Sequence, residues 1–326
     1  MNKTNKIKVI VITGPTATGK TSLAVKIGRS YNGEIISADS RQVYRGLDIG
    51  TGKDIEEYGT GDNAVKYHLI DIASPRKEYN LRQFNLDAIN LINNIENNNK
   101  LPIIAGGSVL YIDSLISNYD FPRLPPDEEI RERFKNKSTS DLIEFLEANY
   151  PDIIKRQTSD LTRPRLTRLI EAVLSKRNRR HSDASNFEWL IVGTFFQRSM
   201  VHKRIELRLD ERLSNGMIEE IELLHKQGVS WERLDSFGLE YRYVSKMLKN
   251  EVSFAEMRLT LLAKIRKLAR SQDVWFRKLE KKGHKIHWIP KGDFNKASLL
   301  ISDFLKNKPI PEPTTRLMDI YYGPKS

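Results

Sequence analysis

Short apolar runs alternate with helix-like segments over the first third of the chain. The apolar runs occupy residues 9–12, 34–37, 67–72 and 101–105. Between the last two runs, Phe84, Ala88, Leu91 and Ile95 recur at helical spacing, and the Asn-rich residues 97–99 end the pattern. Short apolar runs bounded by turn residues predict buried strands, and their alternation with helices predicts a parallel sheet with helices on both faces.

The pattern changes near residue 121. Pro122, Pro125 and Pro126 interrupt it, and helix-forming segments rich in Arg and Glu follow to about residue 184. Asp141 precedes an apolar stretch and is expected to be the N-cap of a helix there. Residues 189–195 return to the character of a buried strand. We therefore expect a core domain over residues 1–120, a helical insertion over residues 121–186 and the rest of the core over residues 187–308.

The last third is predicted to be mainly helical. One apolar face comprises Ile205, Leu209, Leu213, Met217, Ile221 and Leu224, before Gly228. A second stripe comprises Phe254, Met257, Leu261, Ile265, Leu268 and Trp275, with basic side chains on another face of the same helix. Residues 284–289 predict a closing strand, and residues 309–326 are expected to form a loose tail.

Charge and cysteine content narrow the classes of partner. The chain has 54 Lys and Arg against 42 Asp and Glu, a formal net charge of +12. Such an excess favours a polyanionic partner, although a Lys-rich source would give the same balance. The absence of cysteine excludes disulfides, thiolate metal sites and a cysteine nucleophile. No apolar run approaches the length of a membrane span, so we expect a cytoplasmic monomer with no membrane partner.

A phosphate-loop pattern follows the first predicted strand. Residues 14–21 read GPTATGKT and precede a helical pattern. In such a loop, backbone N–H groups turn toward the phosphates, Lys20 reaches the outer oxygens and the Thr21 hydroxyl ligates Mg²⁺. The predicted phosphate or diphosphate site comprises Gly14, Thr16, Ala17, Thr18, Gly19, Lys20 and Thr21. This predicts a P-loop NTPase-like α/β fold.

The loop alone does not name the reaction. Asp39, Asp71 and Ser108 all follow predicted strands, so they are expected near the loop at the carboxyl edge of the sheet. A kinase of small metabolites would bind ATP on the loop and use Asp39 and Asp71 around the metal and substrate. We expect Asp71 to be structural rather than catalytic.

The residues around the loop carry a more specific signal. Residues 37–53 read SADSRQVYRGLDIGTGK and resemble the SADSxQVYxGxDIGTxK signature of the tRNA dimethylallyltransferases, also called tRNA isopentenyltransferases. The loop resembles that family's GPTxSGKT, with Thr18 in place of Ser. The blocks HLID at residues 68–71 and LPIIAGG at residues 101–107 are similar to the next two family blocks, and the resemblance continues to about Arg277.

The resemblance implies a particular use of the loop. In this family the loop holds the diphosphate of dimethylallyl diphosphate, and the prenyl group passes to N6 of an adenine beside the tRNA anticodon. Asp39 would be the general base for the exocyclic amine. Ser108 would stand at the bridging oxygen, and Arg208 with Mg²⁺ would stabilise the leaving diphosphate. The implied contacts to the tRNA anticodon stem-loop, several of them in the insertion and the long C-terminal helix, are Asp39, Ser40, Arg41, Gln42, Arg165, Arg168, Arg270 and Gln272.

Three other functions stay open at this point. The first is prenyl transfer to free AMP, ADP or ATP, which the basic charge and the insertion disfavour because a free nucleotide needs neither. The second is the small-molecule kinase, which ATP consumption would reveal. The third is a non-catalytic RNA-binding protein, for which the combination of Lys20, Thr21 and Asp39 would be unnecessary.

Overall fold

The computed structural model describes residues 6–119, 127–155, 161–174 and 186–319. The chain divides into two compact units, Met1–Tyr119 with Ala184–Ser326, and Asp120–Asp183. The first unit is built on a six-stranded sheet in the order β3-β2-β4-β1-β5-β6, in which every pairing is parallel. The strands are β1 (Ile7–Thr13), β2 (Gly33–Ser37), β3 (Tyr67–His68), β4 (Leu101–Gly106), β5 (Phe187–Phe195) and β6 (Ile286–Pro290). The predicted fold class is confirmed.

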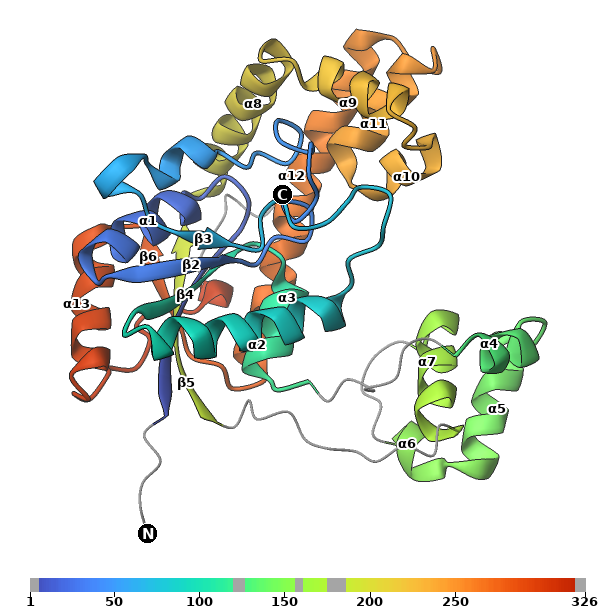
Figure 1. Cartoon of the computed structure of the whole chain (residues 1–326), viewed down its shortest axis with the longest axis horizontal. Helices are drawn as coiled ribbons and strands as arrows, with labels where there is room; N and C mark the ends of the chain where they lie inside the picture. Colours follow the sequence, from blue (N-terminus) through green and yellow to red (C-terminus); the bar gives the residue numbers. More distant parts are fainter. Residues whose placement is uncertain (1–5, 120–126, 156–160, 175–185, 320–326) are drawn as a thin grey trace. The chain divides into compact units, whose positions relative to one another are not determined.

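Helices cover both faces of the sheet (Figure 1). One face packs against α2 (Leu81–Asn97), α3 (Val109–Ile116) and the end of α12 (Phe254–Lys281). The other face packs against α1 (Lys20–Ser30) and α13 (Phe294–Leu305). Because successive side chains of a strand point to opposite faces, Val9 and Val11 enter the first core and Ile10 and Ile12 the second. This explains why β1 reads as a continuous apolar run.

The third strand is shorter than predicted. A strand was expected over residues 67–72, but β3 contains only Tyr67–His68. Leu69 and Asp71 take left-handed backbone conformations with φ of 61° and 56°. The turn allows the backbone N–H of Asp71 to donate to Gln42 O at 3.1 Å. The chain therefore leaves the sheet to support the segment that follows β2.

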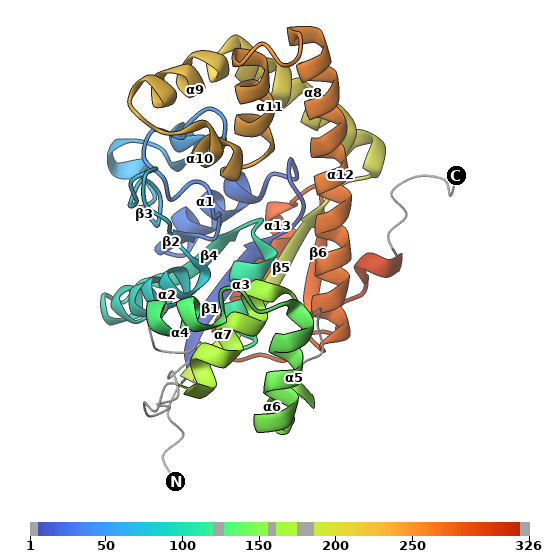
Figure 2. The same cartoon turned by 90° about the vertical axis from the view of Figure 1, so that its right-hand side faces the viewer.

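A separate helical group adjoins the sheet. It contains α8 (Arg198–Ser214), α9 (Met217–Lys226), α10 (Trp231–Ser236), α11 (Leu239–Leu248) and the first half of α12. The apolar face predicted for one helix belongs to two, because the chain turns at Gly216, where φ is 96°. Helix α12 links this group to the sheet and runs along both (Figure 2), with Met257 in the core of the group and Phe276 in that of the sheet.

The second unit has its own small helical core. It contains α4 (Glu128–Phe134), α5 (Thr139–Asn149), α6 (Pro151–Lys155) and α7 (Arg163–Leu174). Its buried apolar side chains are Phe134, Leu142, Leu146, Leu166 and Ile170. The expected N-cap at Asp141 is wrong. Helix α5 begins earlier, Ser138 is the N-cap, and the Asp141 carboxylate accepts the Ser138 N–H at 2.9 Å in a capping box.

Part of the C-terminal segment is packed rather than loose. Leu317 is buried, and its N–H donates to Glu280 Oε1 on α12 at 3.0 Å. The tail prediction is therefore wrong at this residue, because one apolar side chain with one backbone hydrogen bond anchors the segment. Within the described parts of the chain, no helix is both long enough and apolar enough to cross a membrane.

Candidate active site

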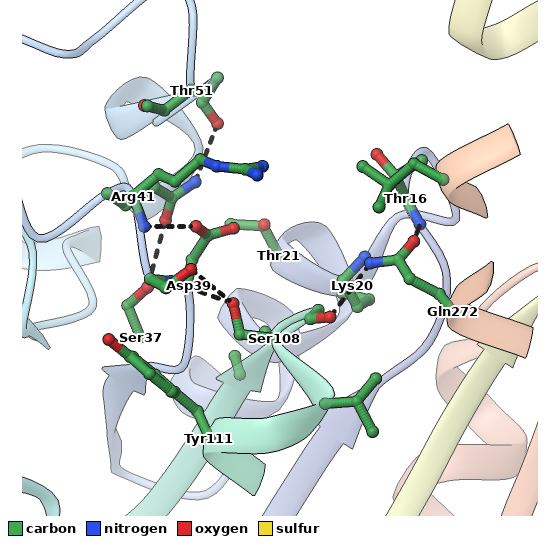
Figure 3. Close-up of a pocket in the computed structure, with 18 of the residues that line it drawn as sticks. Thr16, Lys20, Thr21, Ser37, Asp39, Arg41, Thr51, Ser108, Tyr111 and Gln272 are labelled. Carbon is green, nitrogen blue, oxygen red and sulfur yellow. Dashed lines mark hydrogen bonds between the residues drawn. The ribbon is translucent and has the colours of Figure 1, made fainter. Parts of the chain in front are cut away.

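A cavity of about 620 Å³ opens at the carboxyl ends of β1, β2 and β4. Three segments that leave these strands line it, together with side chains of α8 and α12 (Figure 3). Of the predicted site residues, those that line the cavity are Thr16, Lys20, Thr21, Asp39, Ser40, Arg41, Gln42, Ser108, Arg208 and Gln272. Parallel strands deliver their C-terminal loops to one edge, so residues far apart in sequence meet here.

The phosphate loop separates into residues that shape it and residues that face the cavity. Gly14 has φ of 146°, and a Cβ there would lie 2.4 Å from Thr194 O. Gly19 is the left-handed residue before α1, with φ of 76°. The buried Thr18 hydroxyl donates to Pro15 O at 2.8 Å and lies 2.8 Å from Thr194 Oγ1. Gly14, Thr18 and Gly19 therefore shape the loop, and these three residues and Ala17 do not line this cavity.

Lys20 is a partly buried cation that lines the cavity. Its Nζ donates to Pro15 O at 2.7 Å, a carbonyl rather than a carboxylate. The pKa of Lys20 is lowered to about 8, first by burial and then by the positive charge of Arg208, while the charge of Asp39 partly offsets both. A partly buried ammonium held by a neutral carbonyl is suited to receive an anionic ligand.

Asp39 and Ser108 are held by the backbone that follows β2. The N–H of Arg41 donates to Asp39 Oδ1 at 3.0 Å, and the N–H of Ser40 donates to Ser108 Oγ at 3.0 Å. The Ser108 hydroxyl donates in turn to Ser40 Oγ at 3.3 Å. Figure 3 shows Asp39 beside Thr21, and Ser108 between Asp39 and Lys20. The carboxylate and the hydroxyl thus border one space in front of the loop.

Two amide side chains cross-link the walls of the cavity. Gln42 accepts from Ser37 Oγ at 3.1 Å and donates through Nε2 to Gly52 O at 3.1 Å. Gln272 accepts the N–H of Thr16 at 2.9 Å and donates to Gly107 O at 3.0 Å. Each amide has two donor hydrogens and two acceptor lone pairs. One donor and one acceptor of Gln42 therefore remain for a ligand, in a fixed orientation.

Three arginines on one face of α8 point toward the loop and the cavity. Arg204 donates to Ala17 O at 2.7 Å, which holds the loop from outside. Arg208 lines the cavity and pairs with Asp54 at 2.7 Å. Arg212 also lines the cavity, and the sequence interpretation missed it. Arg204, Arg208 and Arg212 recur every four residues, a spacing that places them on one helical face and could have identified Arg212.

The remaining predicted residues are not among those that line this cavity. Arg270 is exposed on α12 and does not line the cavity. Arg165 and Arg168 belong to the second unit. Arg168 pairs with Glu171, a buried carboxylate that also pairs with Arg131 at 2.7 Å. Asp71 pairs with the buried Lys53 rather than lining the cavity. That contact places Asp71 in a structural role.

The oxygen donors of the cavity fit a magnesium ion that a diphosphate carries. The Thr21 hydroxyl and the Asp39 carboxylate line the same space. No cluster of three or more His, Cys, Asp or Glu residues able to hold a metal occurs in the described ranges. Mg²⁺ in phosphate-binding sites is commonly held by one or two protein oxygens, with phosphate and water completing the shell. A small protein donor set is therefore what such a site requires.

Comparison with known proteins places the chain among related enzymes. The model of the family described as IPP transferase matches residues 42–279. The tRNA dimethylallyltransferase 2 of Treponema denticola is 43% identical over 301 residues, which cover 89% of this chain and 98% of that relative. The tRNA dimethylallyltransferase 1 of Syntrophus aciditrophicus is 41% identical over 290 residues, covering 88% and 94%.

Solved structures agree with the sequence relatives. The full-length tRNA isopentenylpyrophosphate transferase of Bacillus halodurans is 27% identical with a TM-score of 0.66, covering 93% of this chain and 96% of that one. A eukaryotic dimethylallyltransferase acting on tRNA has a TM-score of 0.74 over 94% of this chain and 81% of that one, at 22% identity, which supports the fold alone. The resemblance drawn from the sequence motifs is confirmed, and the chain belongs to the IPP transferase family.

Proposed function

We propose that this chain is a tRNA dimethylallyltransferase. It transfers the dimethylallyl group of dimethylallyl diphosphate to N6 of the adenine next to the tRNA anticodon and releases diphosphate. The observation that carries the proposal is the single cavity in which Lys20 and Thr21 of a phosphate loop, the carboxylate of Asp39 and the amide of Gln42 meet. The names of the curated relatives support tRNA as the acceptor.

The bond changes balance within this set of groups. The lone pair of N6 forms a bond to the allylic carbon, the bond between that carbon and the diphosphate oxygen breaks, and its electrons leave with the diphosphate. The aromatic amine is a weak nucleophile that becomes acidic as the new bond forms, so a nearby carboxylate assists by taking its proton. Asp39 is the base in this proposal, since it lines the cavity in front of the loop.

The other end of the cavity stabilises the developing negative charge. Lys20, the loop amides and Arg208 would hold the diphosphate before and after the allylic bond breaks. The Ser108 hydroxyl, which lies in the same wall, would donate to the bridging oxygen. The Thr21 hydroxyl would hold Mg²⁺, which would supply further charge neutralisation to the diphosphate.

The acceptor end would use the segment that follows β2. The remaining donor and acceptor of Gln42 match an adenine edge, which presents an amino donor and ring-nitrogen acceptors. Ser40, Arg41 and Gln272 line the same wall. Arg270 on α12, with Arg165 and Arg168 of the insertion, would contact the tRNA backbone. In this proposal the insertion over residues 121–186 is a tRNA-contacting domain, and the enzyme is a cytoplasmic monomer.

The test combines wild type with the isosteric variant Asp39→Asn. Each protein is incubated with Mg²⁺, labelled dimethylallyl diphosphate and unmodified tRNA that carries adenine 3′ to the anticodon. Asparagine can still accept the Arg41 N–H but cannot take a proton, so transfer should fall by roughly a hundred- to ten-thousandfold. Pyrophosphate affinity, measured by calorimetry, should stay within about threefold. Asp303→Asn on α13, outside the cavity, is the matched control and should retain full activity.

Two parallel reactions separate the alternatives. Label on AMP but not on tRNA would move the enzyme to the class that prenylates free nucleotides. No label on either acceptor, with ATP hydrolysed in a control, would replace prenyl transfer with phosphoryl transfer. Transfer by Asp39→Asn at the wild-type rate would remove Asp39 as the base while leaving the reaction itself intact.

A further inference from the structure

Arg212 lines the same cavities as Arg208 and lies on the same helix. Both side chains line the main cavity. Both also line a smaller adjoining cavity, together with Thr16 and Ala17 of the loop. Arg212 is therefore next to the diphosphate end of the site rather than only next to its acceptor end.

Gly52 shows how close the two guanidinium groups lie. A Cβ placed on Gly52 would be 1.7 Å from Arg212 Nη2 and 2.7 Å from Arg208 Nη2. A side chain at this position would displace both guanidinium groups from this backbone, and the φ of +62° also favours glycine. The two positive charges consequently lie side by side.

The protein only partly compensates the charge of Arg212. Its contacts are long, at 3.4 Å to Gly50 O and 3.6 Å to Glu240 Oε1. By contrast, Arg258 on α12 holds both oxygens of Asp210 at 2.7 Å. Burial lowers the pKa of Arg212, the charge of Arg208 lowers it further, and Glu240 partly offsets both. A partly buried guanidinium whose charge is only partly compensated, beside another cation, is costly unless an anion binds there.

We infer that Arg212 is a further diphosphate-binding residue, which grips the substrate's leaving group together with Arg208 and Lys20. The inference rests on the proposed function and adds a residue to it. A planar guanidinium with five donors matches phosphate oxygens, and several cations suit the multiple charges of a diphosphate. An adenine edge is neutral and would not require a second arginine.

The test measures the two ends of the site separately. Arg212→Gln, Arg212→Lys and wild type are compared in calorimetric titrations with magnesium pyrophosphate, and in steady-state assays that give KM for dimethylallyl diphosphate and for tRNA. Removing hydrogen bonds to a charged group should weaken pyrophosphate binding by roughly ten- to a hundredfold in the Gln variant. The Lys variant keeps the positive charge but loses the planar guanidinium. Its pyrophosphate affinity should therefore lie between those of wild type and the Gln variant. The KM for tRNA should change less than about twofold.

Arg258→Gln is the matched control, because this arginine pairs with a carboxylate of α8 outside both cavities. It should bind pyrophosphate as wild type does. Unchanged pyrophosphate affinity in Arg212→Gln would overturn the inference, whether or not the KM for tRNA rises. If wild type fails to prenylate tRNA but pyrophosphate binding still depends on Arg212, the proposed function fails and the anion site stands. Thermal unfolding of each variant verifies that the comparison is between folded proteins.

Discussion

At the scale of single residues, the partly buried Lys20 makes anion binding depend on pH. Its pKa is lowered to about 8, mainly by burial. The protonated form binds the anion, so the contribution of Lys20 to pyrophosphate affinity should be complete well below pH 8 and should be lost as the pH rises through 8. Calorimetry across this range tests the prediction. Pyrophosphate also titrates, so Lys20→Arg, which stays charged throughout, should lack the fall that belongs to the protein.

The neighbour of Lys20 offers a second readout of the same effect. Arg208 lowers the pKa of Lys20 by its positive charge. Arg208→Gln should therefore bind pyrophosphate more weakly at every pH, yet its affinity should begin to fall at a higher pH than in wild type. Identical pH profiles for wild type, Lys20→Arg and Arg208→Gln would contradict the assignment of this titration to Lys20.

At the scale of elements, one carboxylate holds the loop that carries Gly52. Glu220 on α9 accepts the N–H groups of Asp48, Ile49 and Gly50 at 2.9, 2.6 and 3.1 Å, and the hydroxyl of Tyr241 at 2.7 Å. Glu220→Ala leaves these donors without a protein partner. We expect it to lower the free energy of unfolding in urea by about 2–4 kcal/mol. Glu220→Gln, which keeps one acceptor oxygen, should cost less.

Tyr241→Phe provides the matched comparison for the loop. It removes one hydrogen bond to Glu220 and leaves the three backbone N–H groups bound, so it should cost only about 1 kcal/mol. A loss below about 0.5 kcal/mol in Glu220→Ala, typical of a surface change, would mean that water replaces the carboxylate and that Glu220 does not hold the loop.

The same element scale separates what the sequence could predict from what it could not. Strands β1, β4 and β5 and the placement of Lys20, Asp39 and Ser108 follow from apolar runs and from the loops after them. The contacts of Glu220 with residues 48–50 are long-range, and no local pattern encodes them. The four-residue spacing on α8 could have identified Arg212, but not its contacts with Gly50 and Glu240. The turn at Leu69 was missed for the same reason, because it is the bond from Asp71 N–H to Gln42 O that draws the chain out of the sheet.

At the scale of the whole molecule, the net charge of +12 favours a polyanionic partner. Exposed basic side chains of α12, which include Lys264, Lys267 and Arg270, lie on the helix that also contributes Gln272 to the cavity. Helix α13 packs on the opposite face of the sheet and carries the exposed Lys296. A polyanion that places a base in the cavity would therefore meet α12 and not α13.

Salt dependence can separate these two helices. Each phosphate that a protein neutralises contributes about 0.7–0.9 to the slope of log affinity against log salt concentration. Arg270→Gln should therefore weaken tRNA binding and reduce the magnitude of that slope by about 0.7–0.9, the share of one phosphate contact. Filter binding at a series of salt concentrations measures both quantities. Lys296→Gln lowers the net charge of the protein by the same one unit, but on α13, and should leave the slope unchanged. Equal losses in both variants would mean that tRNA senses only the total charge of the protein. A loss in Arg270→Gln alone, with pyrophosphate affinity intact, would place the RNA along α12.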